Sequence, residues 1–147
     1  AIFVAFIVWV IFTKTKLGKY MYAIGGNIQA AKVSGINVAK YLIYIYAIAG
    51  ALYGLAGVLE ASRTGGATNN YGNMYELDAI AACVVGGVST TGGIGTVPGV
   101  MVGVLIFTII NYGLTFIGIS PYWQLIIKGL IIVAAVAFDM RKYAAKK

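Results

Sequence analysis

The sequence contains no histidine and only one cysteine, and both shortages exclude familiar kinds of chemistry. Histidine is the most common general base, and neither Cys83 nor any serine has such a base beside it in the sequence. A single cysteine cannot form an intramolecular disulfide or a Cys-based zinc site. We therefore expect neither enzyme activity nor a metal site in this chain.

Charged residues are also scarce. They make up 10% of the 147 residues, against roughly 25% in an average soluble domain. Hydrophobic residues account for 61%, and the mean hydropathy is +0.89. A soluble chain this small could not bury so much apolar surface. The composition predicts an integral membrane protein that contacts the lipid bilayer, with no nucleic-acid partner.

The chain also lacks the pattern G-x-x-x-x-G-K-[ST], whose backbone amides and lysine hold nucleotide phosphates. The most similar glycine pattern in the chain consists of Gly93, Gly95 and Gly99, which have neither the spacing nor the downstream acid of a dinucleotide site. We expect no cofactor in this chain, so any ATP and Mg²⁺ must bind to a partner subunit.

Long uncharged runs indicate where the chain crosses the membrane. Residues 41–59 carry no charge, and as a helix they would cover about 29 Å of a hydrocarbon core that is about 30 Å thick. The 49 uncharged residues between Asp78 and Lys128 must turn back, and the glycines and proline of TTGGIGTVPG at 90–99 provide the turn. The segments long enough to span are 41–59, 97–118 and 122–138.

The distribution of charge predicts which ends face the cytoplasm. Nine of the eleven basic residues lie in the first loop and in the C-terminal tail, which by the positive-inside tendency are both cytoplasmic. Three of the four acids lie in or beside the loop at 60–76, which is therefore predicted to be outside. The nine basic residues are Lys14, Lys16, Lys19, Lys32, Lys40, Arg141, Lys142, Lys146 and Lys147.

Two cytoplasmic ends require an even number of crossings between them. Only three segments are long enough, so the short, glycine-interrupted stretch from Leu77 to about residue 92 is predicted to be the fourth. The apolar run after Ala1 lacks the charged start and cleavage site of a signal peptide, and we expect it to be the end of a truncated span. The predicted fold is an all-α polytopic membrane bundle of about five spans in one domain, residues 1–147.

The cytoplasmic loop at about 13–40 contains a short predicted helix within GGNIQAAKVSGIN. Asn27 is suited to cap its start, and Gly35 to adopt the left-handed conformation after its end. An isolated helix of about seven residues is marginal in water, so it must dock on the spans or on a partner. Ala30, Ala31 and Ser34 give it a face of small residues that allows close approach.

Pairs of glycines at G-x-x-x-G spacing let helix backbones approach closely in lipid. The spacing predicts close packing of spans within this chain or against a second copy of it. The glycines concerned are Gly50, Gly54, Gly57, Gly99 and Gly103.

A few polar residues are candidates for function. Glu60, Arg63, Glu76 and Asp78 border the outer loop, where they can cap helices, form ion pairs, close a gate or meet a partner. Lys128 lies inside a span, so it either snorkels outward or pairs with Glu60, Glu76 or Asp78. The remaining candidates serve either a substrate pathway or interhelical hydrogen bonds. They are Asn111 and Gln124.

Two stretches carry a resemblance to a known family. They are LGKYMYAIGGNIQAAKVSGINV in the basic loop and YELDAIAACVVGGVSTTGGIGTVPG after the first complete span. From about Thr13 to Tyr143 the chain resembles the permease subunit of bacterial monosaccharide ABC importers, in the branch that includes ribose, xylose and branched-chain amino acid permeases. Family members are longer, so the resemblance implies a C-terminal portion located in the cytoplasmic membrane.

The resemblance also implies partners and a substrate. The helix within 25–37 would be the coupling helix that seats in the ATPase subunit, and the outer loop would meet a periplasmic sugar-binding protein. A second permease copy is implied, and galactose or a methyl galactoside is the substrate implied first, with ribose, xylose and branched-chain amino acids as alternatives. An ion-coupled carrier or channel is the alternative from another class. The implied ATPase contacts are Asn27, Ala30, Ala31, Ser34 and Gly35.

Overall fold

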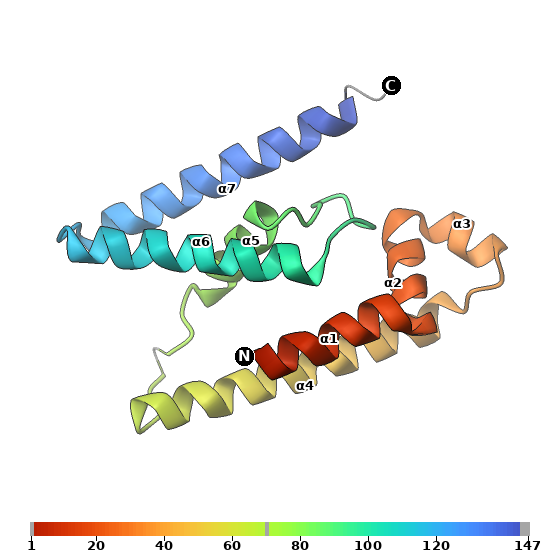
Figure 1. Cartoon of the computed structure of the whole chain (residues 1–147), viewed down its shortest axis with the longest axis horizontal. Coiled ribbons are helices and arrows are strands. Elements are labelled where there is room, and N and C mark those ends of the chain that lie inside the picture. Colours follow the sequence, from red (N-terminus) through yellow and green to blue (C-terminus); the bar gives the residue numbers. More distant parts are fainter. Residues whose placement is uncertain (1, 70, 145–147) are drawn as a thin grey trace.

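The computed structural model describes residues 2–69 and 71–144 (Figure 1). Within these ranges the chain forms helices and no strand, which confirms the all-α prediction. Lys146 and Lys147 of the predicted cytoplasmic tail lie outside the described residues. The helices are α1 (Ile2–Lys14), α2 (Lys16–Gly26), α3 (Ile28–Val33), α4 (Val38–Thr64), α5 (Tyr75–Val85), α6 (Val97–Phe116) and α7 (Pro121–Ala144).

In the described part of the chain, three helices are long and apolar enough to cross a membrane: Val38–Thr64, Val97–Phe116 and Pro121–Met140. The predicted spans 41–59 and 122–138 lie within two of them, and the predicted span 97–118 extends two residues beyond the end of the third. Helix α1 is apolar as well, but its 13 residues are fewer than the roughly 20 that a complete span needs.

The predicted fourth crossing is helical only in its first half. Helix α5 has 11 residues, about 16 Å at the usual rise, and gives way at Gly86 to an irregular segment of residues 86–96. Three glycines of this segment adopt positive φ, which is incompatible with continued helix: Gly87, Gly92 and Gly93. Helix and irregular segment together lead from the end of the molecule where α4 stops to the end that carries α2 (Figure 1).

Polar side chains at the helix starts explain most of the boundaries. Thr15 accepts a hydrogen bond from the Gly18 amide at the start of α2, and Asn37 accepts one from the Lys40 amide at the start of α4. At the start of α6, Thr96 caps the helix and a proline occupies its first turn. Helix α4 ends where Gly65 turns left-handed at φ 71°.

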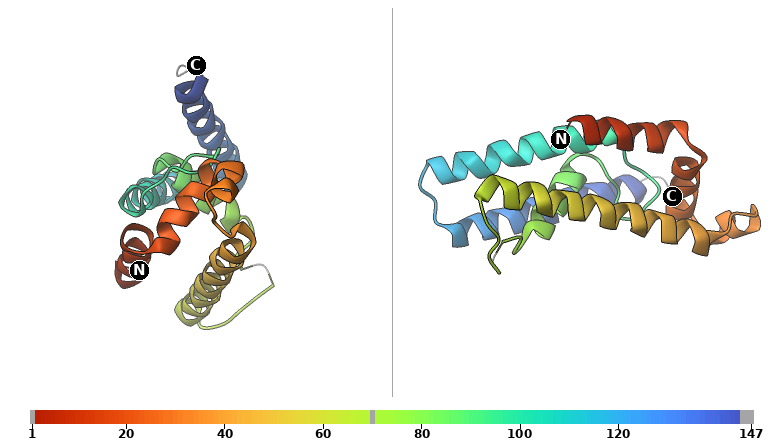
Figure 2. Two further views of the ribbon diagram at one scale, coloured as in Figure 1. Left: turned by 90° about the vertical axis from the view of Figure 1, so that its right-hand side faces the viewer. Right: turned by 90° about the horizontal axis from the view of Figure 1, so that it is seen from below.

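The helices form two packed groups, and one span, α4, has few neighbours. Helix α5 packs against α6 and α7, while α1 and α2 pack together and α1 also contacts α6. Helix α4 touches only α2 and α3 in the described part of the chain, and diverges from the other long helices (Figure 2). The two small cores consist of Ala81, Ala82 and Phe107, and of Ile24, Ala31 and Val38.

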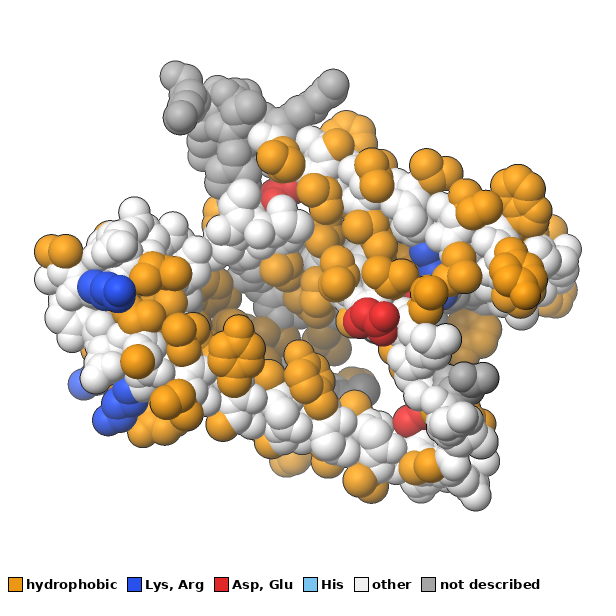
Figure 3. Space-filling view, turned by 180° about the vertical axis from the view of Figure 1, so that it is seen from behind, with side chains coloured by type: hydrophobic (Ala, Val, Ile, Leu, Met, Phe, Trp, Pro, Cys, Tyr) orange, Lys and Arg blue, Asp and Glu red, His pale blue; other side chains and the backbone are white. Residues whose placement is uncertain are grey.

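Most apolar side chains therefore remain uncovered. Hydrophobic side chains are spread along the helices in Figure 3, while most of the visible Lys and Arg side chains gather at the end that carries α2 and α3. No residue in the most apolar stretch of α4 is buried within the described part of the chain. Such a surface suits a segment surrounded by lipid and by further protein.

Candidate functional site

Helix α3 is held in place by the caps that the sequence predicts. The Asn27 side-chain oxygen accepts hydrogen bonds from the backbone amides of Gln29, at 2.9 Å, and Ala30, at 3.0 Å. Gly35 follows the helix at φ 80°, and its amide donates to the Lys32 carbonyl. The helix has six residues, and because it is so short its position depends on contacts with α2 and α4.

The small-residue face of α3 is turned partly toward its own chain. Ala31 is only 3% exposed and packs with Ile24 of α2 and Val38 of α4. Ala31 is one of the residues predicted to contact a partner, and in this structure its side chain lies in this small core. Ala30, Ser34 and Gly35 remain exposed.

Two side chains of α3 that the sequence prediction did not single out are apolar and exposed. Val33 is 90% exposed and Ile28 is 50% exposed, although both lie in the polar, lysine-containing loop rather than in a span. An exposed apolar side chain outside the spans can contribute to a protein interface. The signal was present in the sequence, since Val33 follows Ala31 by two positions and must face away from a helix side that docks through Ala31.

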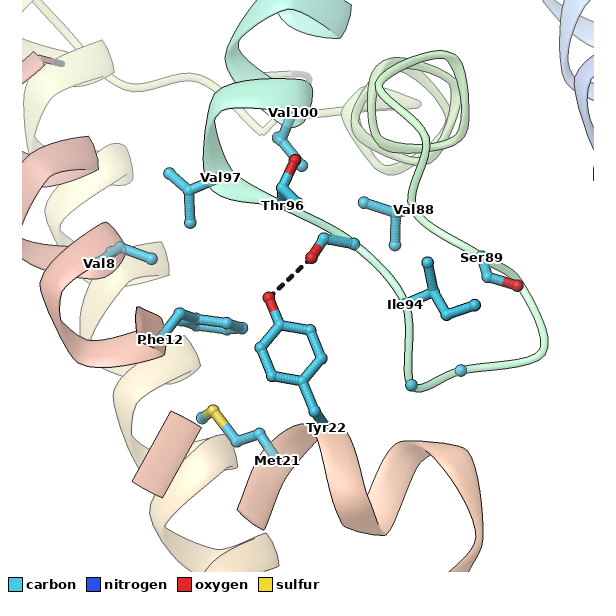
Figure 4. Close-up of a pocket in the computed structure, with 13 residues that line it drawn as sticks. Val8, Phe12, Met21, Tyr22, Val88, Ser89, Ile94, Thr96, Val97 and Val100 are labelled. Atoms are coloured by element: carbon cyan, nitrogen blue, oxygen red, sulfur yellow. Dashed lines mark hydrogen bonds between the residues drawn. The ribbon is translucent and has the colours of Figure 1, made fainter. Parts of the chain in front are cut away.

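Immediately before α3, helix α2 contacts the irregular segment 86–96. The Tyr22 hydroxyl donates a hydrogen bond of 2.7 Å to the Gly95 carbonyl (Figure 4). A Cβ atom added to Gly25 would lie 2.8 Å from the Gly93 amide nitrogen, so the two backbones meet directly. Beside this contact lies a mostly apolar cavity of about 380 Å³, lined by α1, α2, segment 86–96 and α6.

The other side of segment 86–96 is bound to α7. The Ser89 hydroxyl donates to Asp139 Oδ2 at 2.9 Å, and the Thr90 amide donates to the same oxygen at 3.2 Å. Ser89 is 7% exposed. Because α2 and α7 both hold it, the segment is fixed at the same end of the molecule as α3.

The two groups of G-x-x-x-G glycines differ in their surroundings. Gly99 and Gly103 lie against the backbone of α5 and its end, where a Cβ atom on Gly103 would meet the Ala82 carbonyl oxygen. For the α4 glycines, an added Cβ would find no atom within 4 Å in the described part of the chain. These are Gly50, Gly54 and Gly57.

The charged candidates of the outer loop form two separate pairs rather than one cluster. Lys128 Nζ of α7 lies 2.7 Å from Asp78 Oδ1 of α5, and the lysine side chain is only 16% exposed. Of the two alternatives for Lys128, pairing is therefore the one observed. Arg63 and Glu60 form a second pair, at 3.0 Å, within α4. Glu76 has no ion pair with another described residue.

The remaining polar candidates lie near the turn between α6 and α7. The Gln124 amide donates to the Ile119 carbonyl at 2.9 Å, so it ties down this turn. Asn111 Oδ1 is buried and has no hydrogen-bond partner among the described residues. Within the described ranges, no hydrogen bond connects Asn111, Gln124 and Lys128 with one another. Residues 2–69 and 71–144 also contain no cluster of three or more metal-ligating side chains.

The sequence is similar to known transport proteins. The family described as branched-chain amino acid transport system / permease component matches residues 1–136. A galactose/methyl galactoside import permease protein from Haemophilus influenzae is 66% identical over 97% of this chain and 43% of its own length. The corresponding protein from Escherichia coli is 66% identical over 95% of this chain and 42% of its own length.

A ribose import permease protein from Bacillus subtilis is also similar. It is 47% identical over 94% of this chain and 43% of its own length. The chain thus spans less than half the length of the curated relatives it matches. No solved structure matches the chain significantly.

Proposed function

We propose, since this chain belongs to the family of branched-chain amino acid transport system permease components, that it forms part of the membrane path of an ABC importer. In this proposal the importer carries a monosaccharide, and galactose or a methyl galactoside is the first choice because relatives of those names are 66% identical. A separate ATPase subunit supplies the energy.

The proposed orientation places α3 and the end of α7 in the cytoplasm. Five lysines lie at this end, in or beside α1 to α4, and lysine-rich segments are retained on the cytoplasmic side. The opposite end, with the loop between α4 and α5, then faces outward, where a periplasmic sugar-binding protein would deliver the substrate.

The observation that carries the proposal is the exposed apolar side chain of Val33 on α3. Val33 projects from a capped helix whose opposite side is held by Ala31, and Ile28 is exposed at the start of the same helix. A capped helix with an exposed apolar side chain is suited to a groove in a partner protein. We assign this groove to the ATPase subunit, with Ala30, Ser34 and Gly35 at the edges of the contact.

Two further assignments support the same function. The uncovered glycines of α4 suit close packing against the rest of the permease or against a second copy of it. The pairing of Lys128 with Asp78 leaves Lys128 engaged rather than free, which weakens the alternative of an ion-coupled carrier. Asn111 stays a candidate for the substrate pathway because its side-chain oxygen is buried without a described partner.

Val33 provides the most direct test. In the full-length permease, Val33→Glu should weaken co-purification with the importer ATPase by at least about tenfold, because a charge in an apolar interface must be desolvated. Val33→Ile keeps an apolar side chain and should co-purify like the wild type. Equal retention of the ATPase by the glutamate variant would contradict the assignment of α3.

The substrate requires a separate measurement. Reconstituted with its ATPase and binding protein, the permease should show ATP hydrolysis that galactose or methyl galactoside stimulates more than ribose or xylose does. Stronger stimulation by ribose would replace the proposed substrate while leaving the importer assignment intact.

A further inference from the structure

Helix α2 and the segment that follows α5 meet backbone to backbone. Gly25 approaches Gly93 so closely that a Cβ on Gly25 would lie 2.8 Å from the Gly93 nitrogen. In the reverse direction, a Cβ on Gly93 would lie 2.7 Å from the Gly26 Cα atom. Real Cβ atoms do not come this close to backbone atoms, so side chains at these positions would force the two segments apart.

One hydrogen bond holds this contact in register. The Tyr22 hydroxyl, one turn before Gly25, reaches across to the Gly95 carbonyl at 2.7 Å (Figure 4). The tyrosine is partly buried beside the ring of Phe12, which lies 5.8 Å away in an edge-to-face arrangement. Because the ring is packed, loss of the hydroxyl would remove the hydrogen bond without removing the side chain that fills the space.

Helices α2 and α3 form a single rigid corner. Asn27 ends α2 by donating its amide to the Ala23 carbonyl, at 3.1 Å, and starts α3 with its side chain. Only Gly26 and Asn27 separate Gly25 from Ile28, the first residue of α3. A displacement of α3 must therefore also displace Gly25, unless the corner itself unfolds.

On the far side of the contact, segment 86–96 leads directly into the packed core of the spans. Ser89 and Thr90 bind Asp139 of α7, and Gly86 packs against Gly99 of α6. The segment also continues from α5, whose Asp78 pairs with Lys128. Movement of the segment would therefore also displace the end of α5, the start of α6 and the part of α7 that contains Asp139.

From these contacts we propose that Tyr22 and Gly25 are positioning residues that transmit movement of α3 to the broken helix formed by α5 and segment 86–96. This inference rests on the proposed function, because it gives α3 a partner that moves it. It assigns the transmission to a backbone contact that only glycine permits and to one hydrogen bond.

The test compares two neighbouring glycines. Gly25→Ala places a methyl group against Gly93, whereas an added Cβ on Gly26 would find no atom within 4 Å, so Gly26→Ala is the matched control. Tyr22→Phe removes only the hydroxyl. Each change is made in the full-length permease, reconstituted in liposomes with the importer ATPase and the sugar-loaded binding protein.

Three quantities are measured: the yield of the complex, basal ATP hydrolysis, and the ratio of stimulated to basal hydrolysis. Tyr22→Phe should lower the stimulation ratio about fivefold, the effect expected from losing about one hydrogen bond in a two-state coupling. Gly25→Ala should lower the ratio at least as much, because its methyl group forces the Gly93 backbone away. Complex yield and basal hydrolysis should stay at wild-type levels, and Gly26→Ala should match the wild type in all three. A merely structural role would lower the yield instead of the ratio.

The outcomes separate the inference from the function on which it rests. If the wild-type complex forms and is stimulated by sugar, but Tyr22→Phe and Gly25→Ala keep the full ratio, the inference is wrong and the proposed function stands. If Gly25→Ala fails to assemble, the ratio measured with Tyr22→Phe decides the inference. A wild-type permease that binds no ATPase would overturn the proposed function itself.

Discussion

Asp78 and Lys128 are charged residues on mainly apolar helices, and their opposite charges compensate each other. Moving a single charge out of water is costly, and in membrane segments such residues usually pair or line a water-filled space. The two atoms are 2.7 Å apart, while the side chains retain 31% and 16% exposure. The pair is thus neither fully buried nor freely solvated, and it joins α5 to α7.

Removing one partner should therefore destabilise the protein. Asp78→Asn leaves the Lys128 ammonium without its counter-charge and should reduce stability by about 1–3 kcal/mol, between the values for exposed and fully buried pairs. Thermal unfolding of the full-length protein in detergent measures the change. The double variant Asp78→Asn with Lys128→Met removes both charges and should recover part of the loss. A single variant that unfolds like the wild type would show that the pair contributes nothing.

The caps of α3 illustrate what single residues allow one to predict. Asn27 and Gly35 act locally, through bonds to backbone groups at most three positions away, and the sequence therefore predicts both correctly. The burial of Ala31 depends on Ile24 and Val38, which approach it only through the tertiary fold. The same limit applies to Lys128, whose partner lies 50 positions earlier and was one of three candidates.

Helices α5 and α6 pack together more extensively than any other pair in the described part of the chain, and glycine makes their approach possible. Gly103 lies against the Ala82 carbonyl, and the small side chains of Ala81 and Ala82 complete the contact with Phe107. In lipid, helices gain little from the hydrophobic effect between them, so such close packing supplies much of the association energy.

Gly103→Ala should disrupt this contact, whereas the matched change Gly113→Ala on the same helix should not. A Cβ on Gly103 would overlap the α5 backbone, and a Cβ on Gly113 would find no atom within 4 Å. Overpacking of this kind costs about 1–3 kcal/mol. Thermal unfolding of the two full-length variants, side by side, checks the prediction. Similar stability for both variants would show that α5 and α6 are not packed as described.

For the short helix α5, the sequence pattern predicts that the helix exists but not which residues its continuation contacts. Two cytoplasmic ends require an even number of crossings, and for this reason the sequence predicts a crossing near residues 77–92. The glycines of this stretch predict that its helix is interrupted. The pattern did not predict that the irregular half would contact Gly25 of α2, because that contact joins residues nearly 70 positions apart. Contacts of that kind depend on the arrangement of spans, for which hydropathy provides no information.

The fold as a unit is open on the side of α4. This helix contacts only α2 and α3 in the described part of the chain, and its three spaced glycines face no atom there. The curated relatives are more than twice as long as the portion matched. The sequence predicts that α4 spans a membrane, but it does not predict which surface packs against the glycines of this helix.

The two ends of the molecule carry different kinds of residues. One end carries the lysine-rich loop, α3 and the fixed segment 86–96, and the other carries the Glu60–Arg63 pair and the loop before α5. We propose that the first end contacts an ATPase subunit through Val33 of α3.

Photocrosslinking from single positions tests that claim most directly. A photoreactive amino acid is placed at Val33, which is 90% exposed on α3, or at Phe116, which is 94% exposed at the opposite end. In cells that produce the full-length permease with its importer partners, position 33 should crosslink to the ATPase subunit and position 116 should not. Absence of the ATPase adduct at position 33, or an equal yield from position 116, would contradict the account.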